Sequence, residues 1–148
     1  MKILLVEDDG YKSTAIKNWI SKQYCDDEVV IATSYRDGCI AALDGGYDFL
    51  ILDMALPART QKLGSDKDTI VNGGELIIRE LLDEEVGFKA VILTQYETFN
   101  GETIEAIDER LRNMCGECFY GCVSYNSQDD SWKDNLQILM NHVKSAHC

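Results

Sequence analysis

Short apolar runs alternate along the chain with longer stretches in which apolar residues recur at helical spacing. The runs are Lys2–Val6, Glu28–Ala32, Tyr47–Leu52, Lys89–Leu93 and Phe119–Ser124. They are rich in β-branched residues and lack the regular polar alternation of a half-exposed strand, which is typical of strands buried on both faces. Strand followed by helix, repeated five times, predicts parallel strands joined by right-handed crossovers. We therefore expect a doubly wound α/β fold, a five-stranded sheet between two layers of helices.

The stretches between the runs carry apolar stripes typical of amphipathic helices. The clearest stripes consist of Ala15, Ile16, Trp19 and Ile20; of Ile104, Ile107, Leu111 and Met114; and of Trp132, Leu136, Leu139, Met140 and Val143. Ser34 followed by Asp37 resembles a capping box, which opens a helix. We expect residues 1–148 to form a single domain.

Composition and charge narrow the possible functions. The 148 residues are 45% hydrophobic, which is enough for one core of ordinary size. A formal net charge of -12 opposes binding to phosphate backbones, so we do not expect nucleic acid as a partner. No apolar stretch reaches 18 residues, and the apolar run at the N-terminus is too short for a signal peptide. These features predict a soluble cytoplasmic protein that does not bind membranes.

Six cysteines are an even number, but without an export signal they are expected to be reduced thiols. Cys115, Cys118 and Cys122 form a C-x2-C-x3-C cluster, for which Cys148 or one of the two histidines, His142 and His147, would be a fourth ligand. Three ligands without a second C-x2-C pair are a weak zinc or iron-sulfur motif, and free cysteine also packs as a buried apolar residue. The sequence leaves both interpretations open.

Acidic residues gather where the predicted strands end. The first run ends in Glu7, Asp8 and Asp9, the third in Asp53 and the fourth in Thr94. In open α/β sheets, ligands bind outside the carboxyl ends of the strands. Two carboxylates 4 Å apart repel by roughly 4 kcal/mol at an effective dielectric of 20, so such a site favours a bound cation, and oxygen ligands suit Mg²⁺. Beside that cation a carboxylate can attack the phosphorus of a phosphodonor, with the Thr94 hydroxyl bonding the transferred oxygens.

These residues lie in motifs that resemble those of response regulator receiver domains, which have the flavodoxin/CheY-like fold. The motifs are "ILLVEDD", "YDFLILDMALP", "GGELIIRELL" and "AVILT", and the resemblance covers nearly the whole chain. It implies that Asp53 is the phosphoacceptor and that Asp8 and Asp9 bind Mg²⁺ together with Asp53. It also implies that the backbone carbonyl of Ala55 completes the protein ligands, and that Thr94 is the switch hydroxyl.

The resemblance further implies a role in two-component phosphorelay signalling. A receiver takes its phosphoryl group from a histidine kinase or phosphotransfer protein, and the surface made by the fourth helix and fifth strand then changes. Such a domain is a phosphoacceptor and not an enzyme, apart from its own phosphorylation and dephosphorylation. No DNA-binding or enzymatic segment follows in this sequence, so we expect a stand-alone receiver that signals through a partner protein or passes its phosphoryl group onward.

The sequence departs from the family at the fifth strand, where receivers place a lysine followed by proline. Ser124 or Tyr125 occupies that place, and no lysine follows until Lys133. Three carboxylates, Mg²⁺ and a lysine sum to zero charge, whereas the site without the lysine stays one unit negative. Phosphorylation should then be harder and less well coupled to conformation.

A second departure is an insertion at about residues 58–72, within "ARTQKLGSDKDTIVNGG". It is polar, so it is a lid, a partner-recognition loop or a tolerated surface insertion. Arg59, Lys62 or Lys67 would replace the missing lysine if this loop folded over the site. Gln95 is a third departure, because receivers commonly have a small residue after the switch hydroxyl.

Two other functional classes remain. A pseudo-receiver, which is a protein-interaction module that works without phosphorylation, is favoured by the missing lysine and opposed by the intact acids. An aspartate-nucleophile phosphatase needs a second acid two residues after the nucleophile, and Ala55 stands at that place. We rank the phosphatase last.

Overall fold

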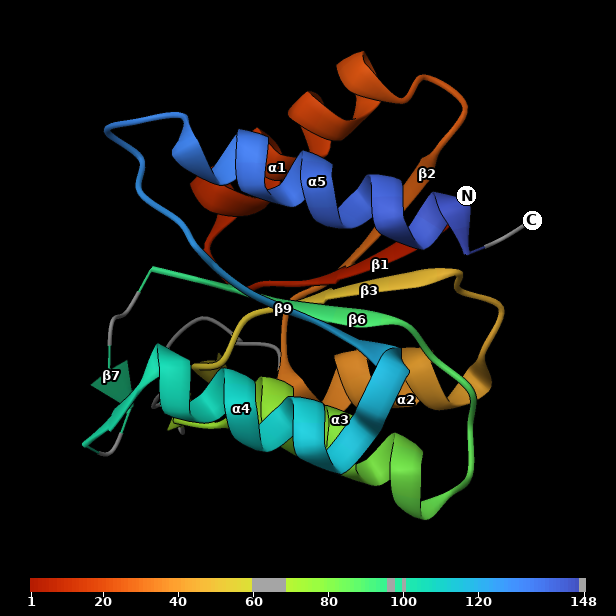
Figure 1. The fold of residues 1–148 in the computed structure, drawn as a ribbon, viewed down its shortest axis with the longest axis vertical. Coiled ribbons are helices and arrows are strands. Elements are labelled where there is room, and N and C mark those ends of the chain that lie inside the picture. The colour runs from red at the N-terminus through yellow and green to blue at the C-terminus, as the bar shows by residue number, and fades with distance from the viewer. Residues whose placement is uncertain (60–68, 96–97, 100, 147–148) are drawn as a thin grey trace.

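The computed structural model describes residues 1–59, 69–95, 98–99 and 101–146 (Figure 1). The described strands are β1 (Lys2–Val6), β2 (Glu28–Ala32), β3 (Phe49–Leu52), β4 (Leu56–Pro57), β5 (Thr69–Ile70), β6 (Ala90–Thr94), β7 (Thr98–Phe99), β8 (Glu102–Thr103) and β9 (Phe119–Ser124). The helices are α1 (Gly10–Gln23), α2 (Tyr35–Asp44), α3 (Gly73–Asp83), α4 (Ile104–Cys115) and α5 (Ser131–Ser145), with a short 3-10 turn at Gly116–Cys118.

The predicted fold class is confirmed. The central sheet has the order β2-β1-β3-β6-β9, and all four pairings within it are parallel. The order reverses between β1 and β3, because the chain first adds β2 on one side and then continues on the other. This reversal is the topological switch point, at which ligands bind in such folds.

Alternate residues of each strand face two different cores. In β1, Ile3 and Leu5 pack with α1 and α5, whereas Leu4 and Val6 pack with α2, α3 and α4. Figure 1 shows the same division, with α1 and α5 on one face of the sheet and the other three helices on the opposite face. Burial on both faces explains the continuously apolar strand sequences.

Side-chain caps start three of the helices. Ser34 accepts a hydrogen bond from the Asp37 N–H (3.0 Å), so the predicted helix start at Ser34 is confirmed. Thr103 caps α4 by accepting from the Ala106 N–H (3.1 Å). Asp9 caps α1, since its Oδ1 accepts from the N–H groups of Tyr11 (2.9 Å) and Lys12 (3.3 Å). Each cap satisfies amide groups that the first helical turn leaves unbonded.

Helix α3 begins in close contact with the end of β3. A Cβ placed on Gly74 would lie 2.5 Å from the backbone oxygen of Asp53, closer than real Cβ atoms approach. The Gly74 N–H also points to the Met54 carbonyl (3.3 Å). Only glycine lets α3 start this close to the strand end that carries Asp53.

A bulge in the edge strand β9 is held by α4. The register with β6 shifts between Ala90 and Val91, which leaves Tyr120 as the extra residue. Arg112 donates to the Tyr120 carbonyl (3.1 Å), and Asp108 accepts from the Cys122 N–H (3.1 Å). Asp108 and Arg112 also pair with each other, so α4 is fixed to the bulged strand by both side chains.

The structure bears on two further predictions. None of the described helices has the length and apolar character needed to cross a membrane. Within the predicted insertion, β5 forms a small antiparallel pair with β4, which directly precedes the insertion, and residues 60–68 lie outside the described part of the chain.

Candidate functional site

Three acidic side chains meet at the carboxyl edge of the sheet. Glu7 and Asp8 directly follow β1, and Asp53 directly follows the neighbouring strand β3. One carboxylate oxygen from each lies within 4.8 Å of the other two. Glu7 and Asp53 are buried, whereas Asp8 is exposed, so the acidic group opens to solvent on the side of Asp8.

The Asp53 carboxylate is oriented by the backbone. Its Oδ1 accepts a hydrogen bond from the Met54 N–H (2.8 Å), and its own N–H donates to the Val6 carbonyl (3.0 Å). The residue is 6% exposed. Asp53 is therefore held between two strands with its Oδ2 oxygen directed toward the remaining site residues.

Lys12 provides a buried cation within this group. It projects from the first turn of α1 and is 2% exposed. Its Nζ lies 2.6 Å from Glu7 Oε1 and 3.5 Å from Asp53 Oδ2, and it donates to the Leu93 carbonyl (3.0 Å). The ammonium group thus contacts both buried acids and the end of β6 at once.

Burial strongly perturbs the electrostatics of Glu7. Burial raises the pKa of Glu7 to about 8, because a charged carboxylate loses its hydration there. The Lys12 ammonium opposes this rise, and the nearby Asp53 carboxylate adds to it. Without a further cation, Glu7 therefore tends to keep its proton at neutral pH.

Thr94 and Tyr125 lie at the same carboxyl edge of the sheet. Thr94 ends β6 and is 1% exposed, and its carbonyl accepts from the Tyr125 N–H (2.7 Å). The Tyr125 ring lies 5.4 Å from Lys12 Nζ, a cation-π distance. Thr94 thus provides a buried side chain with a hydroxyl at the end of β6, and Tyr125, which follows β9, provides an aromatic ring that faces Lys12.

The comparisons with known proteins concern both sequence and structure. No protein-family model matches the sequence. An uncharacterized protein of Sinorhizobium fredii (strain NBRC 101917 / NGR234), y4jR, is 26% identical over 143 residues, which cover 93% of this chain and 95% of that protein.

Solved receiver domains share the architecture. The receiver domain of a putative Luxo repressor protein from Vibrio parahaemolyticus superposes with a TM-score of 0.66 at 16% identity, covering 99% of this chain and 94% of that one. The BeF3-activated receiver domain of Klebsiella pneumoniae RstA gives 0.62 at 22% identity, over 97% and 98%. Thermotoga maritima TrrA in complex with Mg(2+)-BeF gives 0.59 at 18% identity, over 93% and 97%. This chain has the CheY-like receiver fold.

Within this receiver fold, the structure brings together some of the predicted site residues. Asp8 and Asp53 lie in the acidic group, and Thr94 ends the strand next to Asp53. Asp9, a predicted Mg²⁺ ligand, is exposed and caps α1, while Glu7 stands beside Asp8 instead. Ala55 is half-buried two residues after Asp53, and the role of its carbonyl stays a prediction.

Sequence reasoning missed Lys12. The replacement cation was predicted in the insertion, where Lys62 and Lys67 lie outside the described residues and Arg59 is exposed. A signal was present in the sequence: Lys12 stands four residues before Ile16, on the same helical face as the apolar stripe of α1. A lysine on the buried face of a helix, as Lys12 is on α1, points into the interior of the protein.

The cysteines stand apart from this site. The five described cysteines are all free, and among the described residues the group of acids around Asp53 is the one cluster with metal-ligand spacing. Cys148 and His147, two of the possible fourth ligands, lie outside the described part of the chain. Within it, Cys115, Cys118 and Cys122 pack against the core that contains α4.

We expect the cysteines to differ strongly in reactivity. Burial raises the pKa of Cys122 to about 12 and that of Cys115 to about 11, whereas Cys25 is exposed. A thiol of pKa 12 carries about a thousandfold less thiolate at pH 8 than an ordinary thiol of pKa 9. Brief treatment with iodoacetamide at pH 8, followed by peptide mass spectrometry, should label Cys25 and leave Cys122 unmodified. Equal labelling of Cys25 and Cys122 in the folded protein would contradict the structure.

Proposed function

We propose that this protein is a response regulator receiver that accepts a phosphoryl group on Asp53 with the help of Mg²⁺. The observation that carries the proposal is the convergence of Glu7, Asp8 and Asp53 at the switch point of the sheet, next to Thr94. The receiver fold supports it, since solved receiver domains share this architecture over nearly the whole chain.

The acidic group fits a magnesium ion. Its donors are carboxylate oxygens, which Mg²⁺ prefers, and Asp8 is open to solvent, as an ion that keeps several waters requires. Glu7, Asp8 and Asp53 would hold the ion, with the Ala55 carbonyl as a further predicted ligand. When bound, the ion would neutralise charge on the transferring phosphoryl group.

The chain's own residues define the proposed chemistry. A carboxylate oxygen of Asp53 attacks the phosphorus of the donor, a new P–O bond forms, and the bond from phosphorus to the leaving group breaks. The Met54 N–H keeps the Asp53 carboxylate oriented for this attack. The Thr94 hydroxyl would then bond a phosphoryl oxygen, and hydrolysis by water would restore the carboxylate and release phosphate.

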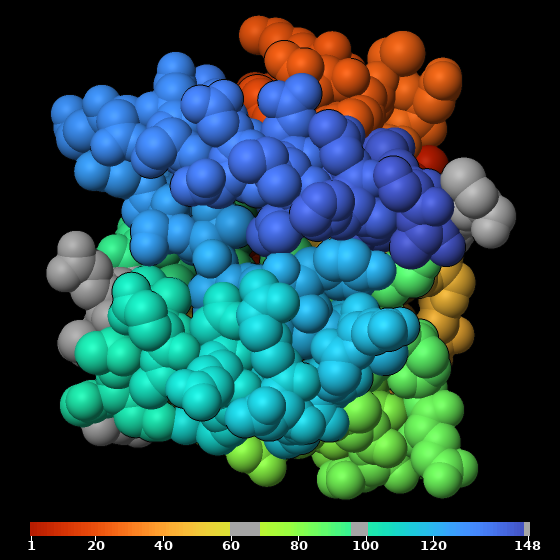
Figure 2. All heavy atoms as spheres, viewed as in Figure 1, coloured from red at the N-terminus to blue at the C-terminus, as the bar shows by residue number. Residues whose placement is uncertain are grey.

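The partners follow from this proposal. The donor would be a histidine kinase or a phosphotransfer protein, and the output would be a partner protein that distinguishes the phosphorylated form. Figure 2 shows α4 and α5 beside each other on one face of the molecule, the face on which receivers change with phosphorylation. Both helices contact β9, so this face is connected to the strand that ends at Ser124.

The test is chemical phosphorylation. With Mg²⁺ and acetyl phosphate, the intact mass of the protein should show a single phosphoryl adduct, because the Asp53 carboxylate displaces acetate. Asp53→Asn should remove the adduct completely. Asp26→Asn, which alters an exposed carboxylate in the turn before β2, should leave it unchanged.

A protein that gains no adduct under conditions that label an ordinary receiver would contradict the proposal. That result would favour the pseudo-receiver, a module that binds its partner without phosphorylation. The main argument for a pseudo-receiver was the missing cation, and the position of Lys12 weakens that argument.

A further inference from the structure

The site lacks the strand-end lysine of receivers but contains a lysine from another element. Ser124 and Tyr125 occupy the strand-end place, and Lys12 reaches the same acids from the first turn of α1. We infer that Lys12 replaces the missing lysine as the cation that faces Asp53. This inference rests on the proposed function and identifies the residue that allows it without a strand-end lysine.

The contacts of Lys12 match those that such a cation needs. An ammonium group that supports a phosphoryl group on Asp53 must lie beside the Asp53 carboxylate, and Nζ is 3.5 Å from Asp53 Oδ2. Its other partners, Glu7 Oε1 and the Leu93 carbonyl, hold it at the edge between β1 and β6. This buried lysine is fixed in place by one hydrogen bond, to the Leu93 carbonyl, and by ion pairs with Glu7 and Asp53.

The sum of the charges at the site also favours Lys12 as the replacement cation. Glu7, Asp8 and Asp53 carry three negative charges when ionised, and Mg²⁺ with Lys12 brings the sum to zero. Phosphorylation replaces the single charge of Asp53 with nearly two, which leaves about one negative charge with Lys12 and about two without it. The deficit that the missing lysine predicts is thus removed by a lysine from α1.

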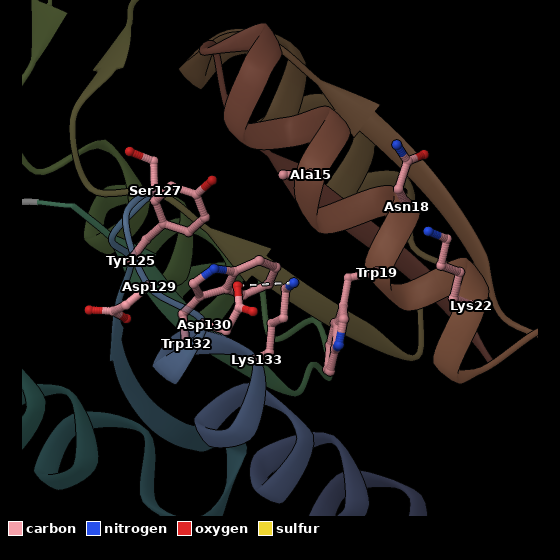
Figure 3. Close-up of a pocket in the computed structure, with 10 residues that line it drawn as sticks. All are labelled: Ala15, Asn18, Trp19, Lys22, Tyr125, Ser127, Asp129, Asp130, Trp132 and Lys133. Atoms are coloured by element: carbon pink, nitrogen blue, oxygen red, sulfur yellow. Dashed lines mark ion pairs between the residues drawn. The ribbon is translucent and has the colours of Figure 1, made fainter.

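Tyr125, which directly follows β9, contacts the lysine through its ring. The Tyr125 ring lies 5.4 Å from Lys12 Nζ and 5.2 Å from the ring of Trp132, which in turn lies 5.6 Å from the ring of Trp19. These aromatic residues line a pocket of about 320 Å³ between α1 and the start of α5 (Figure 3). A change at Lys12 would therefore reach Trp132 through one aromatic ring.

The lysine can also be returned to its usual place. Ser124 pairs in register with Thr94, is exposed, and lines an open pocket of about 480 Å³. A lysine at Ser124 therefore has room to extend over the carboxyl edge of the sheet. Lys12→Met keeps an unbranched chain of similar length inside the protein while removing the charge.

The test compares the wild type, Lys12→Met, the double variant Lys12→Met/Ser124→Lys and the control Lys17→Met. Lys17 is an exposed lysine on the same helix. With acetyl phosphate at saturating Mg²⁺, Lys12→Met should gain the adduct about tenfold more slowly than the wild type. The double variant should recover most of the lost phosphorylation rate, and Lys17→Met should be phosphorylated as fast as the wild type.

Mg²⁺ titration, followed by tryptophan fluorescence, gives a second measurement that does not depend on phosphorylation. Removing the ammonium group beside the acids should tighten Mg²⁺ binding about tenfold in Lys12→Met. Should Lys12→Met fail to unfold cooperatively on heating, Lys12→Gln provides the same test with a polar side chain.

The outcomes separate the two proposals. A wild type without adduct contradicts the proposed function, and the Mg²⁺ titration then decides whether Lys12 belongs to the site. A labelled wild type together with an equally labelled Lys12→Met overturns the inference about Lys12 and leaves the proposed function intact. Slower labelling that Ser124→Lys does not recover would also overturn it, since Lys12 would then act only by supporting the fold.

Discussion

Replacing Gly74 by alanine should lower the free energy of unfolding by about 2 to 4 kcal/mol. The added Cβ would lie 2.5 Å from the Asp53 backbone oxygen and 3.1 Å from the side chain of Ile92. The oxygen belongs to the backbone and cannot rotate away, so α3 must shift from the end of β3 and lose packing there. Overpacking of this kind costs about 1 to 3 kcal/mol, and displacing the first turn of a helix adds to it. Urea unfolding followed by circular dichroism measures the change.

Gly87→Ala is the matched control for this prediction. Gly87 has open space around its Cα, and its backbone does not require a positive φ. Alanine there should be neutral or stabilise the protein by up to about 1 kcal/mol, because it restricts the unfolded chain. Equal stability of Gly74→Ala and Gly87→Ala would show that α3 does not start against Asp53. Since α3 contacts the strand end that carries Asp53, Gly74→Ala should also slow phosphorylation.

Replacing Glu7 by glutamine should change how stability depends on pH. Burial raises the pKa of Glu7 from 4.5 in the unfolded chain to about 8 in the folded protein. Between these values the folded state binds the proton more tightly, so the contribution of Glu7 to stability is present below pH 4.5 and is lost as the pH rises through 8. Glutamine does not titrate and removes this loss.

The measurement is the free energy of unfolding from pH 5 to pH 9 with a chelator present. Between pH 5 and pH 9, the free energy of unfolding of Glu7→Gln should rise by roughly 2 to 4 kcal/mol relative to that of the wild type. Glu28→Gln, which alters an exposed glutamate at the start of β2, should run parallel to the wild type. A Glu7→Gln profile that also runs parallel to the wild type would mean that Glu7 is already ionised in the folded protein. Glu7→Gln should also weaken Mg²⁺ binding, because the acidic group loses one carboxylate.

Much of the fold could be predicted from the sequence, because strands buried on both faces have an unmistakable composition. Lys2–Val6 and Phe119–Ser124 were predicted with the bounds that the structure shows. The third strand begins at Phe49 instead of Tyr47, because the chain pairs with β1 only from Phe49 onward. The helix-opening Ser34 was also predicted, since a capping side chain acts within one turn of the chain. Local chemistry of this kind can be read from neighbouring residues.

Contacts between distant elements could not be predicted in the same way. The buried carboxylate of Glu75 on α3 is paired with Arg79 one turn later and with Arg110 on α4 (2.6 Å). Burial alone would raise the pKa of Glu75, but the hydrogen bonds from Arg110 and Arg79 outweigh burial and lower it. The residues joined by the Glu75–Arg110 pair are 35 positions apart, and only the packing of α3 beside α4 brings them together.

The same difference between local and distant contacts applies to the candidate site. Asp8 and Asp53 were predicted because each stands at the carboxyl end of a strand, a position that sequence order alone defines. Lys12 was missed because its hydrogen bond to the Leu93 carbonyl at the end of β6 joins residues that are 81 positions apart in the sequence. Asp9 caps α1 with the carboxylate that was predicted to bind Mg²⁺, and its role as a ligand stays a prediction. The position of Glu7 beside Asp8 and Asp53 needed three-dimensional information.

The attachment of α4 to the bulge of β9 also protects the protein from association through its sheet. β9 is an edge strand, and unpaired N–H and C=O groups on such an edge are a template for a strand from another molecule. Here the Cys122 N–H and the Tyr120 carbonyl are already bonded to side chains of α4. Substituting Asp108 and Arg112 together would therefore free a template for intermolecular strand pairing, and a concentrated solution of that variant would be prone to aggregate.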